Sequence, residues 1–405
     1  MYSASFNRRL RDDLFQAYFD ARRHKRNTKA QLAFEMEMES KLMGLLEEIR
    51  QHTYRPSPAI CFVVVEPVIR EVFASQFRDR IIHHLLFNYL APIFDPTFIA
   101  DSYSCRKGKG TTYGIERLDH HIRSCTNNYK KMAFVLKLDI QGYFMSIDKL
   151  LLYNIICGKL KKYWAKHGTD ENVPAMNPAF IDYLIKVVLF RDPTKNCIMR
   201  GDTSLFDKVP ASKSLRKQPE GKGLPIGDLT SQLFSNILLS VLDDYIKRKR
   251  GIKHYGRYVD DFFIVHTSKS YLRDLVVDIR AFLRDELKLR LHPKKVYLQP
   301  YEHGVPFLGA FIKPHRIYTV PRSVASFHKT MEEVGFTCMP CDISLEDVDT
   351  VWSLLNSYLG YFSHFKAYKM IRHTMGNNVP VYCHFYFASG YSKAMPRSKY
   401  ERMAS

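Results

Sequence analysis

Two adjacent carboxylates between two β-prone runs constrain this chain more than any other sequence feature. They are Asp260 and Asp261, inside the segment Tyr-Gly-Arg-Tyr-Val-Asp-Asp-Phe-Phe-Ile-Val-His that runs from Tyr255 to His266. Mostly apolar flanks of this length around a short polar dipeptide predict a β-hairpin with two acids at its tip. Two like charges at one turn repel each other, so we expect a cation beside them. An exposed acidic turn is the alternative.

A second segment supplies a third carboxylate at the end of an apolar strand. Residues 133–144 have the sequence Ala-Phe-Val-Leu-Lys-Leu-Asp-Ile-Gln-Gly-Tyr-Phe, in which Asp139 ends the predicted strand and Phe144 follows five positions later. Placed opposite the acidic pair, Asp139 would complete a set that holds two divalent ions roughly 3.5–4 Å apart, the arrangement used for in-line displacement at phosphorus. The three acids therefore predict a phosphoryl-transfer site.

A third segment joins a glycine-containing loop to a helix. Residues 223–236 have the sequence Gly-Leu-Pro-Ile-Gly-Asp-Leu-Thr-Ser-Gln-Leu-Phe-Ser-Asn. Apolar residues at helical spacing over 229–246 predict a core helix. Gly227 has no Cβ, so the backbone there can approach a nucleotide or base pair closely. We assign the start of this segment to the nucleotide, namely Ile226, Gly227, Ser231 and Gln232.

These three motifs, in this order, resemble the palm of a reverse transcriptase, including its Tyr-x-Asp-Asp hairpin at 258–261. Ile-Gly-x-x-x-Ser-Gln stands at 226–232, where most reverse transcriptases have Gln-Gly-x-x-x-Ser-Pro. This form is similar to the reverse transcriptases of diversity-generating retroelements. The resemblance covers roughly residues 55–320. It implies an α+β right-hand polymerase with fingers, a palm of antiparallel sheet plus helices, and a helical thumb.

The resemblance implies a catalytic role for several side chains. Asp139, Asp260 and Asp261 would hold two Mg²⁺ ions, with Asp261 as the weaker ligand. Lys295 matches the lysine that protonates the departing pyrophosphate, and Lys294 is a close rival. Either lysine could instead be an ordinary surface residue.

The resemblance also implies nucleotide contacts. Arg70 matches the position that clamps the triphosphate and packs over the incoming base, and a guanidinium suits both tasks; a salt bridge to Glu66 or Glu71 is the alternative. Phe144 stands where a bulky ring excludes a 2′-hydroxyl, which favours deoxynucleotides, unless it is plain core. The apolar Ile226 removes a polar constraint at the new base pair, which implies adenine-directed misincorporation.

The charge balance favours a polyanionic partner. The 405 residues include 61 Lys and Arg against 41 Asp and Glu, a formal net charge of +20. This charge predicts nucleic-acid binding that weakens steeply with salt, although ribosomal and membrane-surface proteins share such a composition. We expect Arg106, Lys107 and Lys109, in a glycine-rich loop, to contact phosphates.

The cysteines and the apolar runs bear on location. Eight cysteines are scattered without a repeating spacing, which is typical of reduced thiols in a cytosol. Cys338 and Cys341 have half of a zinc-knuckle spacing without a second pair, so no zinc site is expected. No apolar run reaches the roughly 18 residues that a membrane span requires, and the chain does not open like a signal peptide. We therefore expect a cytoplasmic protein, bacterial or phage-encoded, without a membrane partner.

The positions of the motifs predict a domain order. It comprises a helical N-terminal extension at 1–58, fingers at 59–132, palm at 133–158, a basic insertion or return to the fingers at 159–222, palm at 223–320 and a helical thumb at 321–405. The insertion is rich in Pro, Lys and Arg, so we expect an extended loop that faces RNA, or a solvated loop. Residues 307–312 resemble a primer-grip hairpin, and no nuclease domain is expected.

The resemblance implies an RNA-directed DNA polymerase that copies a template-repeat RNA into adenine-mutagenised cDNA. Its partners would be template RNA, the RNA/cDNA duplex, deoxynucleoside triphosphates and a small, basic, oligomeric accessory variability determinant. A group II-like or retron-type reverse transcriptase of ordinary fidelity is one alternative, disfavoured by Ile226 and Gln232. An inactive RNA-binding scaffold is another, disfavoured because a scaffold has no need of three converging acids.

Overall fold

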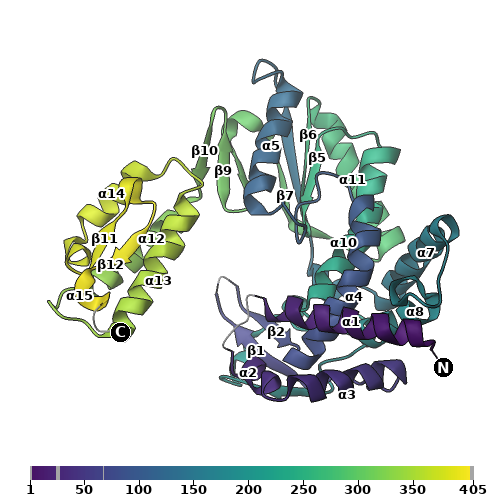
Figure 1. The fold of residues 1–405 in the computed structure, drawn as a ribbon. Helices are drawn as coiled ribbons and strands as arrows, with labels where there is room; N and C mark the ends of the chain where they lie inside the picture. Colours follow the sequence, from purple (N-terminus) through teal and green to yellow (C-terminus); the bar gives the residue numbers. More distant parts are fainter. Residues whose placement is uncertain (1, 24–27, 67, 402–405) are drawn as a thin grey trace. The chain divides into compact units, whose positions relative to one another are not determined.

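The structure, a computed structural model, describes residues 2–23, 28–66 and 68–401. Helices and largely antiparallel sheets make it a mixed α+β protein, which confirms the predicted class (Figure 1). The chain divides into two compact units. The first comprises residues 1–108, 137–264 and 270–297, and the second comprises residues 109–136, 265–269 and 298–405. The bounds of the six segments drawn from the motifs stay predictions.

Helices form the N-terminal part of the first unit. They are α1 (Ala4–Arg22), α2 (Lys29–Glu35) and α3 (Met38–Arg50). The hydroxyl of Ser3 caps α1 by accepting a hydrogen bond from the backbone N–H of Phe6. The helix then buries an apolar stripe at helical spacing and packs on α4 (Phe77–Phe94). This pairing joins the N-terminal segment to the helix that follows the first strands.

A three-stranded sheet lies in the same unit. β1 (Ala59–Val64) pairs antiparallel with β2 (Arg70–Ala74) and parallel with β4 (Cys197–Met199). Alternate side chains of the sheet enter a core formed by Ala59, Cys61, Phe73, Met145, Phe206 and Leu215. The sheet is therefore packed against the segment that carries the first predicted acid.

Residues 159–222 contain regular structure, so the prediction of an extended loop is wrong. α7 (Lys149–His167) runs into this segment, α8 (Pro178–Leu189) follows, β4 joins the sheet of β1, and α9 (Leu205–Lys208) comes after it. The prolines misled the prediction because Pro178 begins α8, directly after the Asn177 side chain that caps the helix. A proline at the first position of a helix starts the helix rather than a loop.

The predicted acids lie on a four-stranded sheet with the order β5-β6-β3-β7. Its strands are β5 (Tyr255–Tyr258), β6 (Asp261–His266), β3 (Phe134–Ile140) and β7 (Leu291–Pro300). The antiparallel pairing of β5 with β6 confirms the hairpin, and β7 lies at the edge of the sheet. The predicted helix over 229–246 is α10 (Leu229–Asp244), and the amphipathic α11 (Lys269–Leu287) follows the hairpin. This order places β3 between the hairpin and β7.

The second unit contains α5 (Thr111–Thr126) and the C-terminal elements. β8 (Val305–Phe307), β9 (Ala310–Lys313) and β10 (Arg316–Thr319) form an antiparallel sheet. Leu308 and Gly309 have φ values of 49° and 82°, which suit a tight hairpin turn at the predicted position. Its primer-grip role stays a prediction.

The C-terminal segment is not wholly helical. α12 (Pro321–Thr337), α13 (Leu345–Phe362) and α14 (Tyr368–Gly376) share one apolar core, and α15 (Ser398–Glu401) follows a short strand pair, β11 (Phe385–Phe387) with β12 (Ala394–Pro396). The sequence pattern missed this pair because each strand has only three residues. Within the described ranges, no helix has both the length and the hydropathy to cross a bilayer.

Candidate active site

The hairpin turn lies one residue earlier than predicted. Tyr258 pairs with Asp261, so Val259 and Asp260 form the two-residue loop and Asp261 opens β6. Val259 has a φ of 54°, in the left-handed region where a β-branched residue is strained. Such strain persists only where surrounding contacts impose it, and it is frequent at functional sites.

Two side chains hold the strained residue by its backbone. The N–H of Val259 donates to Oγ of Ser104 over 3.2 Å, and its carbonyl accepts a hydrogen bond from Nη1 of Arg257 over 2.9 Å. Both polar groups of the Val259 backbone therefore have fixed partners. The direction in which Asp260 leaves the turn is set by these contacts.

Arg257 is fully buried and is held by a network of its own. Its Nε and Nη2 donate to the two oxygens of Asp243 over 2.9 and 2.8 Å, a bidentate ion pair. Nη1 also donates to Asn236 over 3.2 Å, and Nη2 donates to Ser102 over 3.2 Å. Burial alone would lower the pKa of Arg257, but Asp243 raises it above its ordinary value. The guanidinium is therefore a permanent charge beneath the turn.

The segment from Asp101 to Ser104 is a second support of the hairpin. The N–H of Arg257 donates to the carbonyl of Asp101 over 2.8 Å, and the N–H of Tyr103 donates to the carbonyl of Arg257 over 2.9 Å. The side chain of Asn236 donates to the carbonyl of Ser104 over 3.0 Å. Sequence reasoning missed Arg257 and its partners. The available signals were a charged residue inside an apolar strand and an Asp in the apolar stripe of α10.

Replacing Gly256 by Ala should destabilise this hairpin. An added Cβ would overlap Oη of Tyr103 and lie 2.7 Å from Cζ of Phe263, and both rings are fully buried. We expect a loss of about 2 kcal/mol in the free energy of unfolding, measured by urea denaturation. Gly158→Ala in α7 is the control, because nothing lies within 4 Å of its added Cβ, and it should be neutral or stabilising. Equal stability of the two variants would contradict this packing.

The three carboxylates influence one another. Burial raises the pKa of Asp260 to about 6, and the nearby charges of Asp139 and Asp261 add to the rise. Burial also raises the pKa of Asp261 to about 6, although Lys137 opposes the rise. The structure thus brings together the three acids that the sequence predicted, in surroundings that disfavour their negative charge.

Two lysines meet these acids. Nζ of Lys295 donates to Oδ2 of Asp139 over 2.9 Å, and Nζ of Lys137 lies 3.9 Å from Oδ2 of Asp261. Lys295, rather than its neighbour Lys294, thus reaches the acids, which favours Lys295 as the general acid; that role stays a prediction. Lys137 was missed, although it lies two positions before Asp139 and so on the same face of the strand.

The carboxylates suit Mg²⁺ by their chemistry. Their oxygens are the hard donors that Mg²⁺ prefers, and a cation would relieve the repulsion that raises the two pKa values. No three His, Cys, Asp or Glu side chains among the described residues converge into a ready metal cluster. Lys295 and Lys137 supply positive charge in the arrangement seen. Coordination by Asp139, Asp260 and Asp261 therefore stays a prediction.

Phe144 and Ile226 pack against the same core as the β1 sheet. Both are partly buried there, and the carbonyl of Phe144 accepts a hydrogen bond from Leu224 over 2.8 Å. Gly227 is exposed, with a φ of 122°, and its missing Cβ would lie 3.6 Å from the carbonyl oxygen of Phe73 in β2. Gln232 is half-buried in the first turn of α10. Their contacts with a nucleotide stay predictions.

Arg70 begins β2, opposite Val64. No ion pair joins Arg70 to Glu66 or Glu71 in the part of the chain that the structure describes. Glu71 is buried, and its carboxylate accepts a hydrogen bond from the N–H of Leu215 over 3.0 Å. The salt-bridge alternative is therefore not observed, and the triphosphate clamp stays a prediction.

Arg106 is occupied by the protein itself. Its guanidinium donates to Asp95 over 2.6 Å and to the carbonyls of Ile99 and Ser102 over 2.7 and 3.1 Å, and its side chain is only 8% exposed. These bonds favour a structural role over the predicted phosphate contact, because the donors already face protein acceptors. Lys107 and Lys109 stay predicted phosphate contacts.

A sheet that brings together three aspartates from a strand and a neighbouring hairpin has the features of a nucleotidyl-transferring polymerase palm. The family model described as "Reverse transcriptase (RNA-dependent DNA polymerase)" matches residues 67–312. The chain belongs to this family.

Two curated relatives are similar over most of this chain. Group II intron-encoded protein LtrA of Lactococcus lactis subsp. cremoris is 21% identical in an alignment 316 positions long that covers 70% of this chain and 52% of LtrA. Protein YkfC of Escherichia coli (strain K12) is 22% identical in an alignment 315 positions long that covers 69% of this chain and 72% of YkfC. The chain thus spans about half the length of LtrA.

Solved structures of telomerases also align with the chain. Apo telomerase from Candida Tropicalis is 12% identical to this chain and has a TM-score of 0.46; the alignment covers 81% of this chain and 62% of the telomerase chain. Telomerase from Candida albicans in complex with a TWJ fragment of telomeric RNA is 12% identical and has a TM-score of 0.42; the alignment covers 81% of this chain and 60% of the telomerase chain. At these scores the likeness supports no further conclusion.

Proposed function

We propose that this chain is an RNA-directed DNA polymerase that copies an RNA template into DNA from deoxynucleoside triphosphates. The observation that carries the proposal is the grouping of Asp139 with Asp260 and Asp261, two of which have pKa values raised to about 6. Family membership supports the same reaction. Buried acids whose negative charge is disfavoured are typical of sites that bind metal cations for phosphoryl transfer.

In the proposed reaction, each side chain has a separate task. Asp139, Asp260 and Asp261 would hold two Mg²⁺ ions. When bound, these ions would lower the pKa of the primer 3′-hydroxyl and neutralise negative charge on the triphosphate. Lys295, already 2.9 Å from Asp139, would donate the proton that the departing pyrophosphate accepts. Phe144 would exclude the 2′-hydroxyl of a ribonucleotide.

We also propose the narrower role of a diversity-generating retroelement enzyme. It would copy template-repeat RNA into adenine-mutagenised cDNA, together with an accessory variability determinant. Ile226 and Gln232 support this role, because they stand where most reverse transcriptases have Gln and Pro. The alternative is a group II-like enzyme of ordinary fidelity, which the likeness to LtrA supports.

Primer extension on an RNA template with Mg²⁺ and all four deoxynucleotides tests the reaction, and sequencing of the product tests the role. Product with errors concentrated opposite template adenines is expected for the narrower role. Faithful product would leave the polymerase and reject that role. If no product forms even after the accessory protein and cognate RNA are added, the polymerase proposal is rejected.

Ile226→Gln should lower misincorporation opposite template adenine. The amide would restore a polar contact at the new base pair, and one good hydrogen bond corresponds to about a tenfold change in discrimination. Error frequencies from sequenced cDNA measure the effect. Ile226→Leu is the control, because it keeps the apolar contact with the core around Phe73. Unchanged adenine errors in the Gln variant would contradict a role of Ile226 in base selection.

A further inference from the structure

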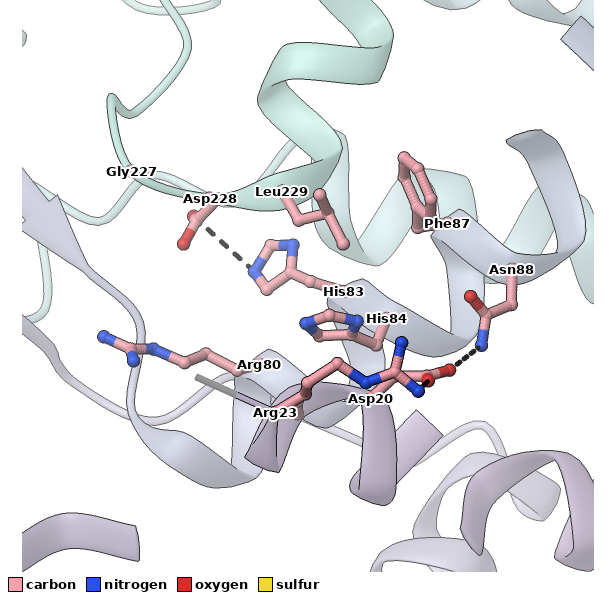
Figure 2. A pocket seen from close by; sticks show the side chains of 11 residues that line it. Asp20, Arg23, Arg80, His83, His84, Phe87, Asn88, Gly227, Asp228 and Leu229 are labelled. Carbon is pink, nitrogen blue, oxygen red and sulfur yellow. Dashed lines mark hydrogen bonds and ion pairs between the residues drawn. The ribbon is translucent and has the colours of Figure 1, made fainter. Parts of the chain in front are cut away.

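His83 of α4 is a buried histidine that contacts the start of α10. Figure 2 shows its ring pointing from α4 toward the loop that carries Gly227 and Asp228. Nδ1 of His83 lies 2.7 Å from Oγ1 of Thr230, and Nε2 lies 3.5 Å from Oδ2 of Asp228. The two contacted residues stand one and three positions after Gly227. A single imidazole therefore contacts both the residue before α10, Asp228, and a residue of its first turn, Thr230.

Both ring nitrogens of His83 have polar partners, the hydroxyl of Thr230 at Nδ1 and the carboxylate of Asp228 at Nε2. A buried ring whose two nitrogens are both engaged keeps one orientation between its neighbours.

Asp228 behaves unusually for its position. It is the residue directly before α10, where an Asp side chain ordinarily accepts a hydrogen bond from a backbone N–H of the first turn. Its side chain makes no such bond. The buried carboxylate faces His83 instead. Asp228 therefore contacts α4 instead of capping the N-terminus of α10.

The same imidazole also contacts the end of β2. Nε2 of His83 lies 3.3 Å from Oγ of Ser75, the residue directly after β2. Ser75 is itself fixed, because its hydroxyl accepts from Arg191 over 3.1 Å and its carbonyl accepts from Arg80 over 3.0 Å. His83 therefore connects the strand that begins with Arg70 to the loop of Gly227.

A pocket of about 530 Å³ lies on the other side of the loop. Gly227, Asp228 and Leu229 line it together with side chains of α1 and α4, both polar ones and Phe87 (Figure 2). His84 also lines this pocket, but among the described residues it makes no hydrogen bond or ion pair with Asp228 or Thr230. Hydrogen bonds through His83 thus add to the packing of Ile226 and Gly227 that holds the loop against β2.

We propose that His83 is a positioning residue that sets the spacing between β2 and the Gly227 loop, and thereby the affinity for the incoming nucleotide. This inference rests on the proposed function, since Arg70 and Ile226 are nucleotide contacts only in a polymerase. His83 does not touch the reacting atoms. Loss of His83 would therefore weaken nucleotide binding without moving the three carboxylates.

Steady-state primer extension with His83→Ala tests the proposal. We expect the KM for deoxynucleotides to rise about tenfold, the equivalent of one lost hydrogen bond, with kcat within about twofold of the wild type. His83→Gln keeps a donor toward Asp228 and should recover most of the affinity. His84→Ala is the matched control and should leave both constants unchanged. An unchanged KM in His83→Ala, with extension that still depends on Asp260, would overturn the inference alone.

Hydrogen exchange gives a readout that does not need activity. In His83→Ala, amides of residues 227–232 should exchange about tenfold faster, whereas those of α8 should keep the wild-type rate. Faster exchange in both places would assign His83 to general packing and overturn the proposal. Absence of Asp260-dependent extension in the wild type would reject the proposed polymerase, while this exchange comparison would still decide whether His83 holds the loop.

Discussion

Asp260→Asn should reduce primer extension by about a thousandfold or more while leaving the metal-free fold at least as stable as the wild type. Asn keeps the size of the side chain but cannot supply the negative charge that a divalent cation requires. Loss of one such contact at the reacting phosphate is worth several kcal/mol in the transition state. Single-turnover extension at saturating Mg²⁺ measures the rate.

The expected stability of metal-free Asp260→Asn follows from the pKa of Asp260. Burial and the neighbouring acids raise it from 3.8 to about 6. The folded protein therefore holds this proton more tightly than the unfolded chain, and folding loses stability as the pH rises from about 4 through 6. Near pH 7.5 the buried charge costs on the order of 3 kcal/mol, a cost that Asn avoids. Metal-free Asp260→Asn should thus melt at a higher temperature than the wild type at pH 7.5.

The difference between the two proteins should shrink toward pH 3, below the ordinary pKa of 3.8, where Asp260 is mostly protonated in both states. Melting curves at pH 3, 6 and 7.5 without divalent ions measure it. Asp285→Asn is the control, because Asp285 is exposed and pairs with its neighbour Arg284. Wild-type activity in Asp260→Asn would refute the catalytic assignment. A lower melting temperature at pH 7.5 would show that the charged form of Asp260 is stabilised by the fold.

Arg257→Met should destabilise the protein by about 3–5 kcal/mol, because it leaves the Asp243 carboxylate buried without its cation. The same change removes the donor that holds the carbonyl of Val259. The strained φ of 54° then loses one of its two supports. Urea denaturation measures the stability, and primer extension measures the effect on the turn.

A second substitution separates these two roles. In Arg257→Met with Asp243→Leu, the buried charge is gone, so most of the lost stability should return. Activity should stay low, because Val259 still has no donor at its carbonyl. Arg284→Met is the matched control: its ion pair with Asp285 is exposed, and its loss should leave the stability nearly unchanged. Full activity in the double variant would contradict the role of Arg257 in holding the turn.

The local elements followed from the sequence. Alternation and apolar spacing predicted the strand before Asp139, the hairpin around Asp260 and the helix after Gly227. The turn itself was misplaced by one residue. The sequence pattern placed the polar pair Asp260-Asp261 in the loop. Strand pairing and the hydrogen bonds of Val259 to Arg257 and Ser104 instead make Val259 and Asp260 the loop residues.

Sequence alone determined the order of the motifs and predicted which of their residues carry the chemistry, because strand and helix periodicity and the motif residues are local properties. Only the tertiary structure decided what holds them. Arg257 pairs with Asp243, His83 contacts Asp228, and Arg106 pairs with Asp95. Each of these contacts joins two different segments of the fold, so strand or helix periodicity does not predict it. Such partners are selected by burial, since a buried polar group must find a hydrogen bond wherever the fold provides one.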